Sequence, residues 1–312
     1  MYAQGTAQRL LSGVIVPVVT GMDSDGVPSA AVAEPHLAAM AEAGVSKLLL
    51  LGSNGEGPLV PTVELDDYLG PVIARWRELV PHGVTVVNVT AAGTREALAR
   101  AHAANRAGAT GVAVSPPIYF HHRDDEIVDH FRRFEDCSLP TVAYNIPRYA
   151  NPLTPSVIEG LSSMTHVVGA KDSSGDPDIL ARLVEIGSHR AEFAVSAGAE
   201  AKLLQALEAG AVGLVPGTAN LAPVLALELL DAWREQRVSE AAQFQSRISE
   251  LATMHAIRPG VPAVKAMLAD RGLLTPYVTP PLLGCSDAEL GRLRDLMVRC
   301  ESDLLGRPHT PQ

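Results

Sequence analysis

Short runs of apolar residues alternate with amphipathic stretches along most of the chain. Such runs are typical of strands buried within a parallel sheet. They predict eight strands, at 13–19, 47–51, 84–89, 111–115, 141–144, 167–171, 192–196 and 212–215. The stretches between them predict helices at 29–43, from 62, at 94–107, at 124–136, from 154, at 176–186, at 200–208 and at 224–234.

This regular succession of strand and helix predicts the fold class. Eight strand-then-helix units fit an α/β structure, a (β/α)8 TIM barrel, over residues 1–236. Three further helical stretches without strands, at 239–255, 261–271 and 287–304, predict a C-terminal helical appendix, residues 237–312, packed on the barrel. A doubly wound open sheet is the alternative, because it has the same alternation, but it rarely needs eight parallel strands.

The sixth apolar run ends in a lysine. Val167 to Ala170 are small or apolar, Lys171 follows, and a polar turn containing Gly175 comes next. Burying an ammonium group costs several kcal/mol, so a lysine at such a position is paired, neutral or functional. A desolvated lysine can lose its proton near neutral pH and attack a ketone as an amine nucleophile. The simpler interpretation is a lysine that ends a strand and extends to solvent.

The barrel hypothesis brings other polar residues toward Lys171. Active-site side chains of TIM barrels come from the C-terminal ends of the strands. Tyr144 ends the fifth predicted strand, Ser53 and Asn54 follow the second, and Tyr119 follows the fourth. We therefore expect these residues to meet in one cavity. Their chemistry suits amine attack, proton relay and carboxylate binding.

Composition narrows the possible partners and surroundings. The formal net charge of −10 argues against nucleic acid and against an anionic membrane surface as partners. Three cysteines, Cys137, Cys285 and Cys300, are odd in number and lack metal-ligand spacing, which favours a reducing, cytoplasmic setting. No apolar run has the length of a membrane span, and no basic segment leads into an apolar one at the start, so neither a span nor a signal peptide is expected.

Three ordered motifs resemble one enzyme family. They are Gly52–Glu56 (GSNGE), Tyr144–Pro147 (YNIP) and Gly169–Asp176 (GAKDSSGD), and 210–220 is similar to the family's eighth-strand pattern. The chain resembles the pyruvate-dependent class I aldolases typified by dihydrodipicolinate synthase and N-acetylneuraminate lyase. The similarity extends from about residue 13 to about residue 304.

This resemblance implies a mechanism that needs no cofactor beyond a covalent imine. Lys171 would form that imine with pyruvate or another 2-oxo acid, and Tyr144 would relay protons. Ser53 and Asn54 would hold the substrate carboxylate, helped by backbone N–H groups near Gly52. The resemblance also implies a homo-oligomer, a dimer or tetramer. Simpler roles are a packed aromatic for Tyr144 and an ordinary turn for Ser53 and Asn54.

The role that the resemblance implies for Tyr119 depends on that oligomer. It matches a tyrosine that enters the active site of a neighbouring subunit in tetrameric relatives. The simpler interpretation of Tyr119 is an exposed aromatic residue on a loop.

Departures from the family motifs bear on the substrate. Dihydrodipicolinate synthases place a carboxylate-binding arginine where this chain has Tyr149, and Arg148 comes one residue early, so its side chain is expected to turn away. N-acetylneuraminate lyase has two adjacent acids where this chain has Glu200 followed by alanine, while Ser173 matches a hydroxyl that contacts sugars. The remaining predicted substrate-binding residues are Gly198 and Val215.

The closest motif details, including Gly260-Val261-Pro262, favour a 4-hydroxy-2-oxoglutarate or 2-keto-3-deoxy acid aldolase. Three alternatives stay open. They are a synthase that condenses pyruvate with aspartate semialdehyde, an imine-based hydratase or dehydratase, and a non-catalytic barrel that binds a keto acid. Adjacent histidines, His121 and His122, could suggest a metal site. No metal is expected, because a third ligand is missing. Residues 52–57 lack the pattern of a nucleotide-binding loop.

Overall fold

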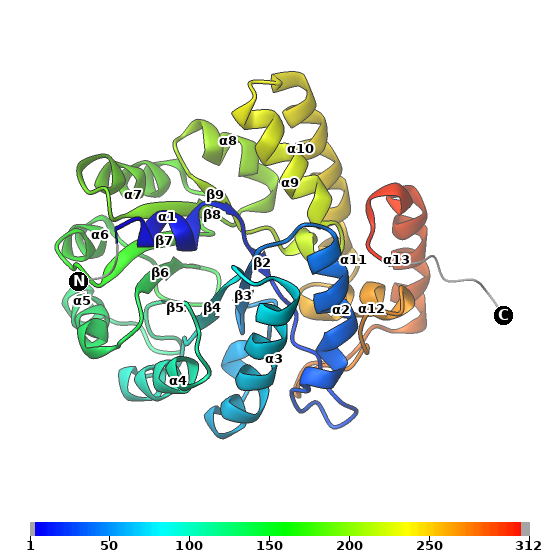
Figure 1. The fold of residues 1–312 in the computed structure, drawn as a ribbon, viewed down its shortest axis with the longest axis horizontal. Coiled ribbons are helices and arrows are strands. Elements are labelled where there is room, and N and C mark those ends of the chain that lie inside the picture. The colour runs from blue at the N-terminus through cyan, green and yellow to red at the C-terminus, as the bar shows by residue number, and fades with distance from the viewer. Residues whose placement is uncertain (1–3, 307–312) are drawn as a thin grey trace.

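The computed structural model describes residues 4–306 and shows a ring of parallel strands surrounded by helices (Figure 1). The strands follow the order β1-β9-β8-β7-β6-β5-β4-β3-β2. The first strand, β1 (Gly13–Val14), pairs with β9, and β2 (Val16–Pro17) pairs with β3. Because only Ile15 separates β1 from β2, this segment joins the two ends of the sheet. The predicted (β/α)8 TIM barrel is therefore confirmed, with its first strand divided into two short ones.

Each later strand leads to a helix on the outside of the ring. The strands are β3 (Lys47–Leu50), β4 (Val84–Asn88), β5 (Gly111–Val114), β6 (Thr141–Asn145), β7 (Val167–Asp172), β8 (Ala194–Ala197) and β9 (Gly213–Leu214). The helices are α2 (Ala30–Glu42), α3 (Leu65–Leu79), α4 (Thr94–Arg106), α5 (Asp124–Arg132), α6 (Pro155–Ser162), α7 (Pro177–His189), α8 (Leu203–Glu208) and α9 (Pro223–Arg234). Every residue of β4, β6 and β7 is buried, as expected for strands covered on both faces.

The sequence pattern did not predict helix α1 (Thr6–Leu11), which closes the N-terminal end of the barrel. Leu10 and Leu11 are buried in one apolar cluster with inward-facing strand residues such as Val142 and Val168. Six residues are too few to give a helical period, so this helix depends on its packing. With one end of the barrel filled, the C-terminal ends of the strands are left for a site.

Helices beyond α9 form the predicted appendix. They are α10 (Val238–Ala252), α11 (Met254–Ile257), α12 (Val261–Asp270) and α13 (Asp287–Arg299). The expected helix at 239–255 is divided between α10 and α11. Figure 1 shows α10 alongside α9, and α12 and α13 beyond α2. The division of the chain into two parts at residue 236 stays a prediction. Residues 307–312 of the predicted appendix lie outside the described part of the chain.

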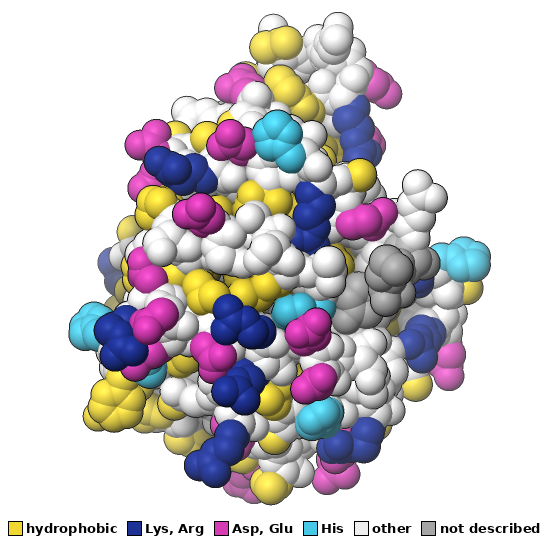
Figure 2. All heavy atoms as spheres, turned by 90° about the vertical axis from the view of Figure 1, so that its left-hand side faces the viewer, with side chains coloured by type: hydrophobic (Ala, Val, Ile, Leu, Met, Phe, Trp, Pro, Cys, Tyr) yellow, Lys and Arg dark blue, Asp and Glu magenta, His cyan; other side chains and the backbone are white. Residues whose placement is uncertain are grey.

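The surface carries charges of both signs. Figure 2 shows one face, on which acidic and basic side chains are interspersed. Such a face does not offer the continuous positive area that phosphate backbones require. Within residues 4–306, no helix combines the length and the apolar character that a membrane crossing would need.

Candidate active site

Two adjoining cavities lie at the C-terminal end of the barrel. The lysine cavity, about 280 Å³, contains Lys171 among its lining residues. The annex cavity, about 420 Å³, is the more apolar of the two and lies between the strand ends and α12. Ser53 and Tyr144 line both cavities, so they form part of the boundary between them.

Lys171 lies near the end of β7 and is 5% exposed. Its ammonium nitrogen is 4.0 Å from the centroid of the Tyr144 ring. Among the described residues, no carboxylate comes within ion-pairing distance of Lys171, whereas Lys265 is paired with Glu56. A Cβ atom at Gly198 would lie only 3.2 Å from Cε of Lys171, so glycine at this position keeps space around the amine.

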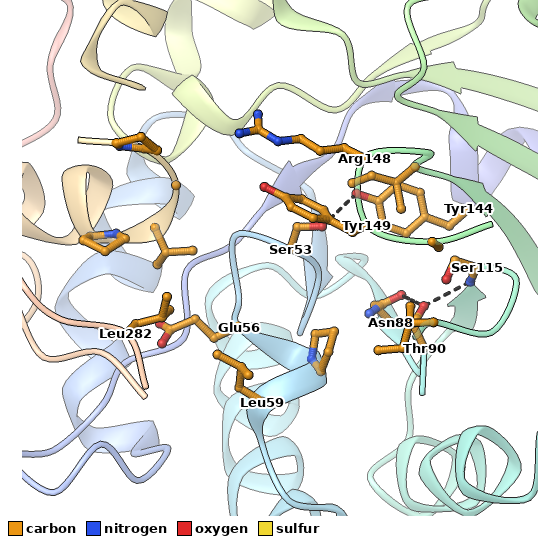
Figure 3. A pocket seen from close by; sticks show the side chains of 18 residues that line it. Ser53, Glu56, Leu59, Asn88, Thr90, Ser115, Tyr144, Arg148, Tyr149 and Leu282 are labelled. Atoms are coloured by element: carbon orange, nitrogen blue, oxygen red, sulfur yellow. Dashed lines mark hydrogen bonds between the residues drawn. The ribbon is translucent and has the colours of Figure 1, made fainter. Parts of the chain in front are cut away.

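Tyr144 and Ser53 are joined by a hydrogen bond. Tyr144, on β6, is 3% exposed, and its hydroxyl is 3.2 Å from Oγ of Ser53, with either group able to donate (Figure 3). Residues Tyr144 and Lys171 are direct neighbours in the pairing of β6 with β7. The structure thus brings together three residues that lie far apart in the sequence, in an order from amine to phenol to hydroxyl.

The glycine-rich loop, residues 52–57, presents Ser53 and Asn54 to the lysine cavity. A Cβ atom at Gly57 would lie 1.8 Å from the carbonyl oxygen of Leu51, so only glycine fits there. Asn54 directs its amide nitrogen at Gly217, where an added Cβ would lie 2.6 Å away. Gly52 does not line either cavity; its carbonyl accepts hydrogen bonds from the N–H groups of Gly55 and Gly57, which shapes the loop.

The far wall of the lysine cavity is polar. Glu200 accepts a 2.6 Å hydrogen bond from the backbone N–H of Thr218, and its other carboxylate oxygen is 3.8 Å from Nε2 of His255. Ser173 and Val215 line the same cavity. Sequence reasoning missed His255, because a single histidine in a C-terminal helix gives no local signal.

Arg148 and Tyr149 both line the two cavities. The expectation that Arg148 turns away is wrong, because the chain turns at the strand exit and leaves both side chains at the mouth (Figure 3). The Arg148 guanidinium is 5.5 Å from the Tyr149 ring centroid and forms no ion pair with any residue of the described range. A free guanidinium at the mouth can receive a substrate carboxylate.

Tyr119 lies outside both cavities. Its side chain is 86% exposed, its φ is 83°, and it contacts Phe120 edge to face at 4.8 Å. The preceding residue, Ile118, lines the annex cavity instead. Within one chain, then, Tyr119 does not reach Lys171.

The residue after Lys171 is an acid that sequence reasoning also missed. Asp172 is 3% exposed and accepts hydrogen bonds from Nδ2 of Asn145, at 2.7 Å, and from Oγ of Ser174, at 3.0 Å. Burial raises the pKa of Asp172, and these hydrogen bonds oppose that shift. The pair with Asn145 ties the end of β6 to the end of β7, where Tyr144 and Lys171 lie.

The metal hypothesis rested on His121 and His122. Within residues 4–306, no group of three or more histidine, cysteine or acidic side chains is arranged to hold a metal ion. His122 instead faces Glu126 at 3.6 Å, one helical turn further along the chain.

Known proteins similar to this chain share its fold and length. An uncharacterised DapA-like lyase of Halobacterium salinarum is 33% identical over 296 residues, which cover 93% of this chain and 95% of that protein. A 4-hydroxy-tetrahydrodipicolinate synthase of Ruegeria pomeroyi is 31% identical, over 78% of this chain and 83% of that protein. The crystal structure of YagE from Escherichia coli, in complex with pyruvate, matches with a TM-score of 0.87 and 24% identity, over 94% of this chain and 99% of that one.

The match to a family is nearly as long as the chain. The sequence pattern of the dihydrodipicolinate synthetase family matches residues 10–299. Enzymes of this family are pyruvate-dependent class I lyases, which form a Schiff base between a lysine and pyruvate and use no external cofactor. The chain belongs to the dihydrodipicolinate synthetase family.

Proposed function

We propose that this enzyme cleaves a 4-hydroxy-2-oxo acid to pyruvate and an aldehyde through an imine on Lys171. One observation carries the proposal. Lys171 is buried, lines a cavity of substrate size, and lies against Tyr144, whose hydroxyl is hydrogen-bonded to Ser53. Among the described residues no carboxylate holds the Lys171 side chain in an ion pair, so its nitrogen is available to attack a ketone.

The reaction begins when the Lys171 amine adds to C2 of the substrate, and loss of water gives the imine. Removal of the proton from the C4 hydroxyl breaks the C3–C4 bond, releases the aldehyde and moves the bonding electron pair toward the imine nitrogen. The enamine that results takes a proton at C3, and water then hydrolyses the imine and releases pyruvate. Tyr144 is suited to move the protons, because its ring lies against the Lys171 amine and its hydroxyl is hydrogen-bonded to Ser53.

Ser53 and Asn54 are suited to bind the C1 carboxylate. Both line the lysine cavity, and their hydroxyl and amide groups can donate hydrogen bonds to a carboxylate. The aldehyde half would then extend toward Ser173, Glu200 and His255. Hydroxyl groups of a 2-keto-3-deoxy acid suit these side chains, whereas the distal carboxylate of 4-hydroxy-2-oxoglutarate suits Arg148.

The assembly is part of the proposal. Tyr119 is exposed next to Phe120, which is 64% exposed, and such a pair favours contact with a second copy of the chain. A dimer or tetramer would let Tyr119 reach a neighbouring subunit's site and extend its proton relay.

A second candidate activity is condensation of pyruvate with aspartate semialdehyde. Arg148 at the mouth and the likeness to the Ruegeria pomeroyi synthase favour it. A hydratase or dehydratase would use the same imine, and a barrel that only binds a keto acid would retain the cavity without turnover.

One assay separates these activities. The purified enzyme is incubated with 4-hydroxy-2-oxoglutarate, with 2-keto-3-deoxygluconate, and with pyruvate plus aspartate semialdehyde, while pyruvate release or consumption is followed with lactate dehydrogenase and NADH. Pyruvate release from either acid supports the proposal. Consumption with the semialdehyde alone would favour the synthase, and no change with any mixture would contradict all the lyase assignments.

A further inference from the structure

A buried ion pair joins the glycine-rich loop to the C-terminal appendix. The side chain of Lys265, on α12, is 0% exposed, and that of Glu56 is 1% exposed where the two meet. Lys265 also donates a 2.8 Å hydrogen bond to the carbonyl oxygen of Tyr277, and Glu56 accepts a 2.6 Å hydrogen bond from the N–H of Thr279. These charges take no part in the mechanism above.

Stability is a weak explanation for this pair. Removing two charges from water costs much of what their attraction returns, and apolar replacements of buried pairs are often as stable. Burial lowers the pKa of Lys265, and the Glu56 carboxylate only opposes that shift. A pair of this kind is more useful for fixing a geometry than for holding the fold together.

The geometry in question is that of the loop that presents Ser53 and Asn54. Glu56 lies two residues after Asn54 and has a φ of 55°, a left-handed conformation that non-glycine residues seldom adopt. Contacts made by this side chain with α12 and Thr279 offset the cost of that conformation. Glu56 also lines the annex cavity, next to the boundary formed by Ser53.

A second buried cation holds the residues that follow Glu56. Arg100, on α4, is 3% exposed and donates hydrogen bonds to the carbonyl oxygens of Gly57, at 2.7 Å, and Val60, at 2.8 Å. The loop is thus held between a helix of the barrel wall and a helix of the appendix. Ser53 lies on the same loop, and its side chain is hydrogen-bonded to Tyr144.

We infer that the Glu56–Lys265 pair is a positioning device, through which helix α12 sets the loop that receives the substrate carboxylate. The inference rests on the proposed function, in which Ser53 and Asn54 bind that carboxylate and Lys171 forms the imine. It assigns the C-terminal appendix a role in substrate binding. Loss of the pair therefore weakens carboxylate recognition and leaves the chemistry of Lys171 itself intact.

The test uses a double variant, Glu56→Gln with Lys265→Met, because replacing only one of the two residues leaves the other charge buried without a partner. Imine formation is trapped with cyanoborohydride over a range of concentrations of pyruvate and, separately, of methyl pyruvate, which lacks the carboxylate charge. We expect the half-saturating pyruvate concentration to rise about tenfold, with that of methyl pyruvate unchanged and the thermal unfolding midpoint near that of the wild type. The glutamine keeps an oxygen that can accept the hydrogen bond from the N–H of Thr279.

Lys47→Met is the matched control. Lys47 is half-buried, and it donates to backbone carbonyls of Arg9 and Ser12 at the opposite end of the barrel. Its loss should leave both half-saturating concentrations unchanged.

The outcomes separate the two proposals. If wild-type enzyme is trapped on Lys171 but the double variant keeps the wild-type preference for pyruvate, or loses pyruvate and methyl pyruvate equally, the positioning role is overturned. Absence of any wild-type adduct on Lys171 would instead contradict the proposed function.

Discussion

The ammonium nitrogen of Lys171 lies over the face of the Tyr144 ring, 4.0 Å from its centroid, and the Tyr144 hydroxyl is hydrogen-bonded to Ser53. The phenol hydroxyl is therefore directed at Ser53. A substrate carbonyl that enters beside Lys171 brings its oxygen toward the phenol, and only then are amine, carbonyl and phenol in a sequence for proton transfer. This arrangement makes separate predictions for the two residues.

Lys171→Ala is expected to abolish turnover and to leave the fold intact, because water can fill the space at the barrel mouth. Borohydride reduction in the presence of pyruvate, followed by peptide mass spectrometry, should locate the adduct on Lys171. Lys202 donates to the carbonyl oxygen of Gly175, and Lys265 is paired with Glu56, so neither offers a free amine. An adduct on Lys202 or Lys265 would contradict this assignment.

Tyr144→Phe should retain pyruvate binding and slow catalysis by about 10²–10⁴, the range for loss of a general acid–base. The phenylalanine keeps the ring beneath the amine and removes only the hydroxyl. The kinetics of pyruvate release, compared with trapping of the pyruvate imine, separate the two effects. Unchanged kcat would show that Tyr144 serves only to pack.

Much of this site could be predicted from the sequence, since Lys171 and Tyr144 each lie one residue before the end of a strand. The apolar runs that lead to Lys171 and to Tyr144 are enough to place both residues at the active-site end, because the C-terminal ends of the strands of a parallel barrel meet at one face. Every residue of β6 and β7 is buried, so their apolar runs stand out in the sequence. Local pattern is sufficient where the residue and the element that positions it are adjacent in the chain.

The features of the site that could not be predicted depend on contacts between segments that lie far apart in the sequence. His255 reaches Glu200 from a short helix that follows α10, and Lys265 reaches Glu56 across most of the chain length. In neither pair do the residues that surround one partner in the sequence indicate the other partner. Arg148 was misjudged for a related reason, since the path of the chain after β6, rather than a count from the preceding proline, decides where that side chain lies.

A buried histidine predicts a pH dependence of stability. His36 is 1% exposed, its Nε2 is 2.8 Å from the carbonyl oxygen of Asn220, and burial lowers its pKa from 6.5 to about 4. The unfolded chain therefore binds the proton first, so stability present above pH 6.5 is lost as the pH falls toward 4, by about 3 kcal/mol for this group. Urea unfolding at pH 7 and pH 4.5 should show a smaller loss for His36→Gln than for the wild type.

The exposed His82 provides the control for this measurement. His82→Gln should lose as much stability between the two pH values as the wild type does. Equal losses for His36→Gln and the wild type would contradict the assigned role of His36.

Tyr119→Ala is expected to shift the enzyme toward smaller assemblies and to lower kcat, because the side chain is 86% exposed in one chain and would be covered by a second copy. Sedimentation velocity and steady-state kinetics measure the two effects. Leu283→Ala, at another exposed apolar residue, should change neither. A wild-type enzyme that is fully active as a monomer would contradict this prediction.

The last prediction concerns the choice of substrate. The resemblance of the motifs implies that Tyr149 takes the place of the synthases' carboxylate-binding arginine. We therefore expect the enzyme to release pyruvate from 4-hydroxy-2-oxoglutarate or 2-keto-3-deoxygluconate and to condense aspartate semialdehyde poorly. Arg148 now makes that expectation testable by a single variant, since it lines the lysine cavity without an ionic partner in the described range. A charge-assisted bidentate pair contributes about 1.5–3 kcal/mol, so Arg148→Ala should lower kcat/KM by roughly 10- to 150-fold for a substrate whose distal carboxylate it binds. We expect that loss for 4-hydroxy-2-oxoglutarate and little change for 2-keto-3-deoxygluconate, whose hydroxyl groups lie toward Glu200 and Ser173. A wild-type preference for aspartate semialdehyde that disappears in Arg148→Ala would mean that Arg148 replaces the missing arginine and that the enzyme is a synthase.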